Sequence, residues 1–346
     1  MIKGCLKSFS GSLKIKYNWQ PLLTYLEQQM KKIEKTINTL DSVTNYYNMG
    51  LDCYGREDYA QAKIYYEKAA EQGYADAQYE LGVLYFDGQG VTQDYVQAKQ
   101  WFEKSAQQKH PKAQYMLGLM YYQGYGVEQD FLQARQWYKK AAKQGIPEAQ
   151  YGVAYTYRYD YKGSKQNFKK VKQWLEKAAE QGLAQAQYDL AFLYYNGQGV
   201  KQNYTQAKKW FEKAAKQGFT DAEHEMGWLY EQGLGVKKDG NKAKKWYQKS
   251  AHKGDPYSQH ALGYMYQHGD GVKRNYAKAK QWLEKSAEQG FDDALYWLGM
   301  MYEKGQGMKR DLIKAKEYYQ QVSQFHYDNA CKRIKIIKKK LKKSKG

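Results

Sequence analysis

The chain has 346 residues and a formal net charge of +20, and 42% of its residues are hydrophobic. No run approaches the roughly 18 to 20 apolar residues that a membrane-spanning helix needs, and the mean hydropathy of −0.95 agrees, so we exclude a membrane-spanning class. The three cysteines, Cys5, Cys53 and Cys331, occupy no repeated position, which argues against a disulfide framework.

The N-terminal region predicts a disordered start followed by a helix. Residues 1–18 contain lysines but no apolar segment of an export signal. We therefore expect a cytoplasmic protein for the chain as written, and a periplasmic one if translation starts further upstream. Residues 19–43 are expected to form a helix that caps the first repeat, because apolar residues recur there three or four apart: Leu22, Leu26, Met30, Ile33 and Ile37.

A block of the form GxGVxxD recurs along most of the chain. Its paired glycines are Gly88 and Gly90, Gly124 and Gly126, Gly197 and Gly199, Gly233 and Gly235, Gly269 and Gly271, and Gly305 and Gly307. An aromatic residue follows at Trp101, Trp137, Trp174, Trp210, Trp246, Trp282 and Tyr318, with every step 36 residues except one of 37. A constant period of this size predicts a solenoid of helix pairs.

Each unit contains start and stop signals for two helices, as the second unit illustrates. Pro111–Gln123 has apolar residues at helical spacing, and proline is tolerated in a first helical turn. Asp130 is placed to accept hydrogen bonds from the free N–H groups of a second helix. That helix is expected to end at Gly145, a glycine position that recurs in the other units.

The pattern AxAQYxLGxxYxxGxGVxQDxxxAxxWxxKAAxQG resembles the Sel1-like repeat, a relative of the tetratricopeptide repeat. Seven such units run from residue 75 to 325. The segment 44–74 lacks the GxGV insertion and is similar to a tetratricopeptide unit, and the third unit replaces the double-glycine loop by YTYRYDYKGSKQNF. The resemblance implies an all-α fold, a right-handed superhelical solenoid of antiparallel helix pairs.

Residues 326–346 are expected to form a basic capping helix and tail, in which Ala330, Ile334, Ile337 and Leu341 pack on the last repeat. Two interpretations of the charge stay open: docking on an acidic partner, anionic lipid or nucleic acid, or a solvated helix end whose cations favour the negative end of the helix dipole. The cationic residues are Lys332, Arg333, Lys335, Lys338, Lys339, Lys340, Lys342, Lys343 and Lys345.

The sequence contains no recognisable catalytic, cofactor or metal constellation. His224 and His260 occupy a column that is tyrosine in most units, and Glu223 and Glu225 are the candidate carboxylates next to His224. Replacement of one ring by another explains these histidines better than a metal pair does. Phosphate-binding glycine loops and nucleic-acid-reading modules are also missing, so we predict a protein that is not an enzyme, needs no cofactor and does not bind nucleic acid.

In the tetratricopeptide fold, which these repeats resemble, a stripe of side chains at positions i, i+4 and i+7 of the first helix lines the concave groove. Here the stripe is aromatic in the early units and turns polar later, at Glu231, Gln267 and Glu303. We predict partner contact at the aromatic part, although packing between neighbouring repeats is an equally open interpretation. The candidates are Tyr79, Val83, Phe86, Tyr115, Leu119, Tyr122, Tyr155, Tyr188, Phe192, Tyr195 and Trp228.

The resemblance implies a scaffold that binds another protein, and most specifically an immunity protein that neutralises a cognate secreted phospholipase-type toxin. One alternative is a cell-wall or β-lactam-acting enzyme of the cysteine-rich Sel1-like type, which depends on cysteine-bridged helix pairs that this chain lacks. Another is an adaptor that associates with an anionic membrane through the basic tail.

Overall fold

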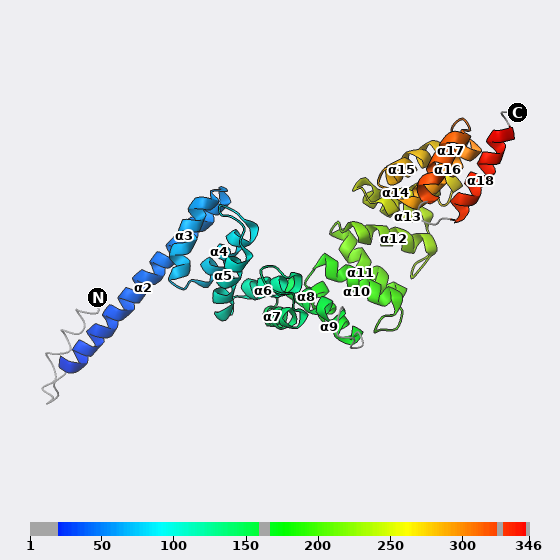
Figure 1. Ribbon diagram of the computed structural model, residues 1–346. Coiled ribbons are helices and arrows are strands. Elements are labelled where there is room, and N and C mark those ends of the chain that lie inside the picture. Colours follow the sequence, from blue (N-terminus) through cyan, green and yellow to red (C-terminus); the bar gives the residue numbers. More distant parts are fainter. Residues whose placement is uncertain (1–19, 159–166, 324–327, 344–346) are drawn as a thin grey trace. The chain divides into compact units, whose positions relative to one another are not determined.

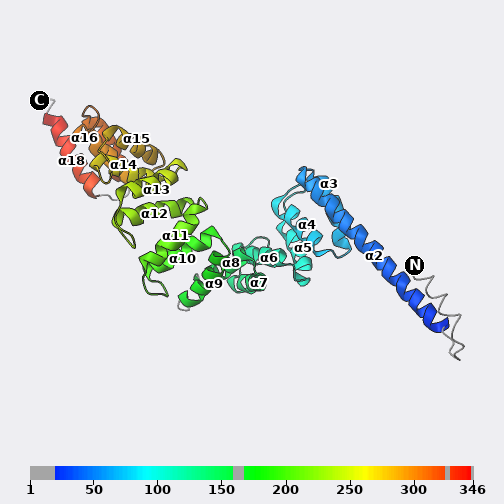
Figure 2. The ribbon, with the colours of Figure 1, turned by 180° about the vertical axis from the view of Figure 1, so that it is seen from behind.

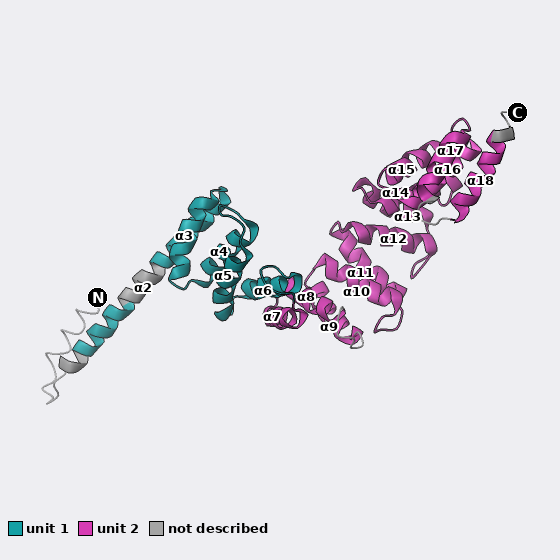
Figure 3. Ribbon diagram, in the orientation of Figure 1, with its two compact units in different colours: residues 1–129 teal, residues 130–346 magenta. Residues whose placement is uncertain are grey.

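The computed structural model describes residues 20–158, 167–323 and 328–343, and all of its regular elements are helices. They form two compact units, residues 1–129 and 130–346 (Figure 3), each of which is described by itself. The first unit contains α2 (Gln20–Gly55), α3 (Tyr59–Glu71), α4 (Ala75–Asp87), α5 (Tyr95–Gln107) and α6 (Pro111–Gln123). The expected disorder of residues 1–18 lies outside the described residues.

The second unit continues the same alternation of helices. It contains α7 (Phe131–Lys143), α8 (Pro147–Arg158), α9 (Phe168–Glu180), α10 (Ala184–Asn196), α11 (Tyr204–Lys216), α12 (Thr220–Gln232), α13 (Gly240–His252), α14 (Pro256–His268), α15 (Tyr276–Glu288), α16 (Asp292–Lys304), α17 (Leu312–Ser323) and α18 (Asp328–Lys343). Within each unit every helix packs against the next one in the chain (Figure 1). The predicted all-α solenoid of helix pairs is therefore confirmed. We call the first helix of a repeat helix A and the second helix B.

The two glycines of each loop have separate tasks. Gly88 ends α4 in the left-handed conformation, and its N–H donates to the carbonyl of Leu84. Gly90 also has a positive φ, and a Cβ there would lie 2.6 Å from the backbone carbon of Tyr59, the first residue of the preceding helix B. The GxG spacing thus combines a helix stop with a close backbone approach that only glycine permits.

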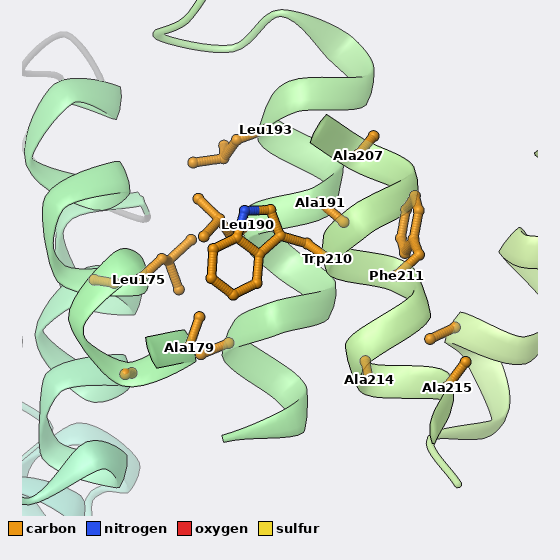
Figure 4. Packing of buried hydrophobic residues seen from close by; sticks show 14 of the residues in the cluster. Leu175, Ala179, Leu190, Ala191, Leu193, Ala207, Trp210, Phe211, Ala214 and Ala215 are labelled. Atoms are coloured by element: carbon orange, nitrogen blue, oxygen red, sulfur yellow. The ribbon is translucent and has the colours of Figure 1, made fainter. Parts of the chain in front are cut away.

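Buried small and large residues fill the space between helices A and B. Leu175 of α9, Leu190 of α10 and Phe211 of α11 belong to one buried cluster (Figure 4), and each of them is at most 2% exposed. The glycine column on helix A leaves room for an aromatic ring of helix B, since a Cβ on Gly82 would meet the Phe102 ring at 2.6 Å. An aromatic ring of helix B therefore packs directly against the glycine of helix A.

The N-terminal region differs from the expected cap. α2 is one helix that runs through the proposed boundary between 19–43 and 44–74, because its sequence contains no glycine or proline between Pro21 and Gly50. Its first buried described side chain is Val43, and Leu26 and Ile33 are 46% and 57% exposed. The early part of α2 extends beyond α3 in both views (Figures 1 and 2), so it does not cover the first repeat.

The C-terminal helix α18 packs on the last repeat. Ala330 and Ile337 are fully buried against Tyr319 and Val322 of α17, and Ile334 and Leu341 lie partly buried beside them. Across the described ranges 20–158, 167–323 and 328–343, no helix is both long and apolar enough to cross a membrane.

Candidate partner-binding surface

In the first unit, the predicted stripe lies on α4 and α6, and all of its members are half-buried: Tyr79, Val83 and Phe86 on α4, and Tyr115, Leu119 and Tyr122 on α6. The ring of Tyr79 lies 5.8 Å from that of Phe102, and burial raises the pKa of Tyr79 to about 12. Phe86 packs edge-on against Tyr95 at 5.2 Å and against Tyr125 at 5.5 Å. These rings therefore support their own repeat and also expose part of their surface.

In the second unit, the stripe forms what we call the α10–α12 aromatic cluster, Tyr188, Phe192, Tyr195 and Trp228. Phe192 stands edge-on to the buried ring of Phe211 at 5.1 Å. Trp228, one repeat further along, donates its indole N–H to the hydroxyl of Tyr195 at 3.1 Å and remains 37% exposed. This hydrogen bond joins the A helices of two neighbouring repeats, and it holds the partly exposed ring of Trp228 in place.

The remaining candidate of the stripe, Tyr155 on α8, lies close to the chain's irregular third loop. It is half-buried, and its ring is 6.1 Å from that of Tyr151. Tyr151 in turn donates to a carboxylate oxygen of Asp189 on α10 at 2.9 Å. Burial, followed by the nearby charge of Asp189, raises the pKa of Tyr151, so this phenol stays a neutral donor. The loop residues 159–166 themselves lie outside the described residues.

Of the residues expected to form the polar half of the groove, Gln267 and Glu303 are buried and Glu231 is half-buried. Glu303 is 6% exposed and accepts a hydrogen bond from the hydroxyl of Tyr319 at 3.1 Å, and Gln267 is 4% exposed. Glu231 accepts from the hydroxyl of Tyr247 at 2.6 Å. These polar groups pair inside the structure because each faces a tyrosine or amide partner, a contact that a single sequence column does not reveal.

The basic tail divides into two sets of side chains. Arg333 and Lys340 lie 3.3 Å and 3.8 Å from the carboxylate oxygens of Glu303, so they neutralise a buried charge of α16. Lys332, Lys335, Lys338 and Lys339 are exposed. The side chains of Lys342 and Lys343, and all of Lys345, lie outside the described residues.

The two histidines of the tyrosine column take part in packing. His224 lies 3.0 Å from the hydroxyl of Ser258 and 3.5 Å from a carboxylate oxygen of Asp255. Burial opposes ionisation of Asp255, but bonds from His224 and Ser258 outweigh it and lower its pKa to about 2. Burial lowers the pKa of His260, whose ring packs 5.3 Å from Phe291.

The two glutamates near His224 do not join it in a metal site. Glu223 lies 2.8 Å from the ammonium of Lys253, and burial raises the pKa of Glu225. In the described part of the chain, no group of three or more histidine, cysteine or carboxylate side chains is placed to hold a metal ion.

Comparison with known proteins gives this geometry a family. The model of the Sel1 repeat matches eight segments: residues 46–74, 75–110, 111–146, 147–183, 184–219, 220–255, 256–291 and 292–322. The chain belongs to the Sel1 repeat family. The opening unit, which we interpreted as similar to a tetratricopeptide repeat, is matched as a shorter Sel1 repeat.

Solved structures of other Sel1 repeat proteins are similar to this one. The antigen c5321 of uropathogenic Escherichia coli strains, a protective antigen with an SLR fold, is 31% identical over 91% of this chain and 68% of that chain, with a TM-score of 0.81. A Sel1 repeat protein from Oxalobacter formigenes is also 31% identical, over 93% of this chain and 95% of that chain, with a TM-score of 0.67. No curated protein matches the chain.

Two features of this Sel1 repeat protein escaped the sequence analysis. The first is the participation of Tyr95, Tyr125 and Tyr204 in the aromatic clusters, since Tyr204 packs 5.3 Å from Tyr195 and Tyr125 stacks on Tyr95 at 5.0 Å. Tyr95 and Tyr204 begin helices and Tyr125 lies in a loop, so the only indication in the sequence was that all three are aromatic. A stripe drawn on one helix cannot include them.

The second feature is a group of cations around Tyr157. Arg135 and Lys139 of α7 and Lys170 of α9 lie 4.4, 5.2 and 5.1 Å from the centre of its ring. Burial opposes ionisation of this phenol, but a hydrogen bond from Lys139 and the three positive charges lower its pKa. The signal was present in the sequence, because five other repeats have glutamate at the position of Lys139: Glu67, Glu103, Glu176, Glu212 and Glu284.

Proposed function

We propose that this Sel1 repeat protein is a non-enzymatic scaffold that binds a partner protein through the α10–α12 aromatic cluster. The observation that carries the proposal is Trp228, a large ring that stays 37% exposed while its indole N–H is bonded to Tyr195. Partly exposed aromatic side chains held rigidly lose little conformational entropy on binding, and such residues dominate the energetics of many protein interfaces. Half-buried Tyr188 and Phe192 extend the same surface.

The test compares two single variants of the full chain. Trp228→Ala removes the exposed ring, and Ile313→Ala removes an exposed apolar side chain of α17, 61% exposed, away from the stripe. We expect a partner captured by the native protein from its own cells to be lost with Trp228→Ala and retained with Ile313→Ala. Equal retention by both variants, with helicity unchanged by circular dichroism, would contradict the proposed surface.

The narrower form of the proposal is an immunity protein that neutralises a cognate secreted phospholipase-type toxin. It rests on the resemblance of the repeats. It predicts that the captured partner hydrolyses phospholipid and that the purified chain inhibits this hydrolysis, with Trp228→Ala inhibiting less. A captured partner without lipid hydrolase activity would reject the narrower form and leave the scaffold intact.

Membrane contact through the tail is the alternative favoured by the exposed lysines of α18 other than Lys340, which pairs with Glu303. Charge reversal of Lys335, Lys338 and Lys339 leaves the buried apolar face of α18 in place, which a truncation would remove. Sedimentation with anionic vesicles is expected to weaken in this variant if the tail docks on lipid. Unchanged sedimentation would exclude the alternative.

A further inference from the structure

Within the described residues, no other element covers the early part of α2. Among its described side chains, Leu26, Met30 and Ile33 are 46%, 48% and 57% exposed, and burial begins only at Val43. Isolated helices gain most of their stability from packing an apolar face, so a helix that presents such a face to water is incomplete by itself.

The apolar residues of this segment follow a heptad spacing. Their successive steps are three, four, three, four and three residues, and they are Leu23, Leu26, Met30, Ile33, Ile37 and Leu40. A spacing that averages 3.5 residues keeps these positions on one seam only if the helix supercoils around another helix. The seam leads into the solenoid, where Tyr47 packs on the core of the first repeat.

The charges beside the seam select the partner and its direction. In heptad register, the flanking positions on one side are acidic, Glu27, Glu34 and Asp41, and those on the other side are uncharged, Leu22, Gln29 and Thr36. Two parallel copies place each acidic position opposite an uncharged one of the other helix. Two antiparallel copies place acidic positions opposite each other, which is unfavourable.

We propose that the N-terminal part of α2, residues 23–40, pairs with the same segment of a second copy as a parallel, in-register coiled coil. A twofold axis along the seam makes each seam residue face itself, so the segment is complementary to its own copy without any further partner. The pairing is independent of the aromatic cluster proposed above to bind a partner protein. It makes the protein a dimer that presents two copies of that cluster.

The first test measures the mass of the full chain by light scattering over a range of concentrations. Elevated salt is used because two chains that each carry +20 repel each other. The expected mass at high concentration is about twice 40.5 kDa. Met30→Ser with Ile33→Ser is expected to weaken association by about a hundredfold or more, since burial of each large apolar side chain is worth about tenfold or more.

The matched control is Tyr25→Ser, which removes an apolar side chain 57% exposed on the same helix but off the seam. It is expected to dimerise as the native chain does. A native chain that stays at 40.5 kDa at every concentration overturns the proposal, and so does a seam variant that dimerises as well as the control.

The second test examines direction and register by cross-linking. A background with Cys5→Ser and Cys331→Ser receives Ile33→Cys, which in a parallel, in-register pair brings the two thiols within reach of a disulfide. Oxidation is expected to give a covalent dimer with this variant and none with Tyr25→Cys. Equal cross-linking of the two variants, or none with Ile33→Cys, overturns the parallel arrangement.

Discussion

Replacing Lys253 by glutamine is expected to destabilise the repeat that contains α12 and α13, and a second replacement, Glu223→Gln, is expected to restore it. In other repeats a glutamine on helix A accepts from the glutamine that caps the end of helix B, at 2.8 Å in each of these pairs: Gln78 and Gln108, Gln150 and Gln181, Gln187 and Gln217, and Gln259 and Gln289. Here an ion pair, Glu223 with Lys253 at 2.8 Å, takes the place of the two amides.

The expected losses of stability follow from the unequal burial of Glu223 and Lys253. The carboxylate of Glu223 is 5% exposed, whereas the ammonium side chain of Lys253 is 40% exposed. Removing one partner of a fully buried pair costs about 3–5 kcal/mol, and partial exposure reduces this to about 1–3 kcal/mol for Lys253→Gln. Glu223→Gln keeps a hydrogen-bond acceptor and leaves an ammonium that water can reach, so we expect it to lower the free energy of unfolding by only about 0.5–1 kcal/mol.

The double variant recreates the amide pair of the other repeats and is expected within about 0.5 kcal/mol of the native free energy of unfolding. Urea unfolding of the four proteins, followed by far-ultraviolet circular dichroism, measures the cycle. The reasoning fails if the two destabilisations add in the double variant, or if Glu223→Gln is the more damaging single change.

Three further changes have defined outcomes. The pKa of Asp255 is lowered from 3.8 to about 2, so its ionised carboxylate contributes about 2 kcal/mol to the free energy of unfolding. This contribution is complete above the unfolded pKa and is lost as the pH falls toward 2. Acid unfolding of Asp255→Asn should lack this pH dependence. The phenol of Tyr157 should ionise below the ordinary pKa of 10.0 in an ultraviolet titration, and Lys139→Glu should raise that pKa. Gly227→Ala should cost about 1–3 kcal/mol, because its Cβ would lie 2.5 Å from a ring of α13, whereas Gly55→Ala meets no atom within 4 Å and should cost less in thermal unfolding.

Local chemistry decides helix starts and stops in this chain, and there the sequence-based predictions agree with the structure. The range Pro111–Gln123 is the range of α6, and Asp130 accepts from the N–H groups of Leu132 and Gln133 at 2.8 and 3.0 Å, as its position predicts. A cap, a stop glycine and a helical period act within a few residues, so they can be read from a short stretch of chain.

The structure differs from the sequence-based predictions where a partner distant in the sequence decides the environment of a side chain. The periodic face of residues 19–43 predicted a helix that caps the first repeat, but the described apolar side chains of that face, Leu26, Met30 and Ile33, are exposed. The sequence placed Glu303 among the polar groove residues, whereas in the structure Arg333, on a later helix, lies 3.3 Å from its carboxylate.

The sequence by itself determined the repeat, the helix boundaries of a regular unit such as Pro111–Gln123, the loop glycines and the family, because each of these depends on residues close together or on a strict period. Only the tertiary structure decided which stripe residues remain exposed and which are buried, because that depends on what the next helix places opposite them. Trp228 shows the difference. Its column in the sequence indicated either packing or binding, and the bond to Tyr195, one repeat away, fixes the ring in place while part of it still faces solvent.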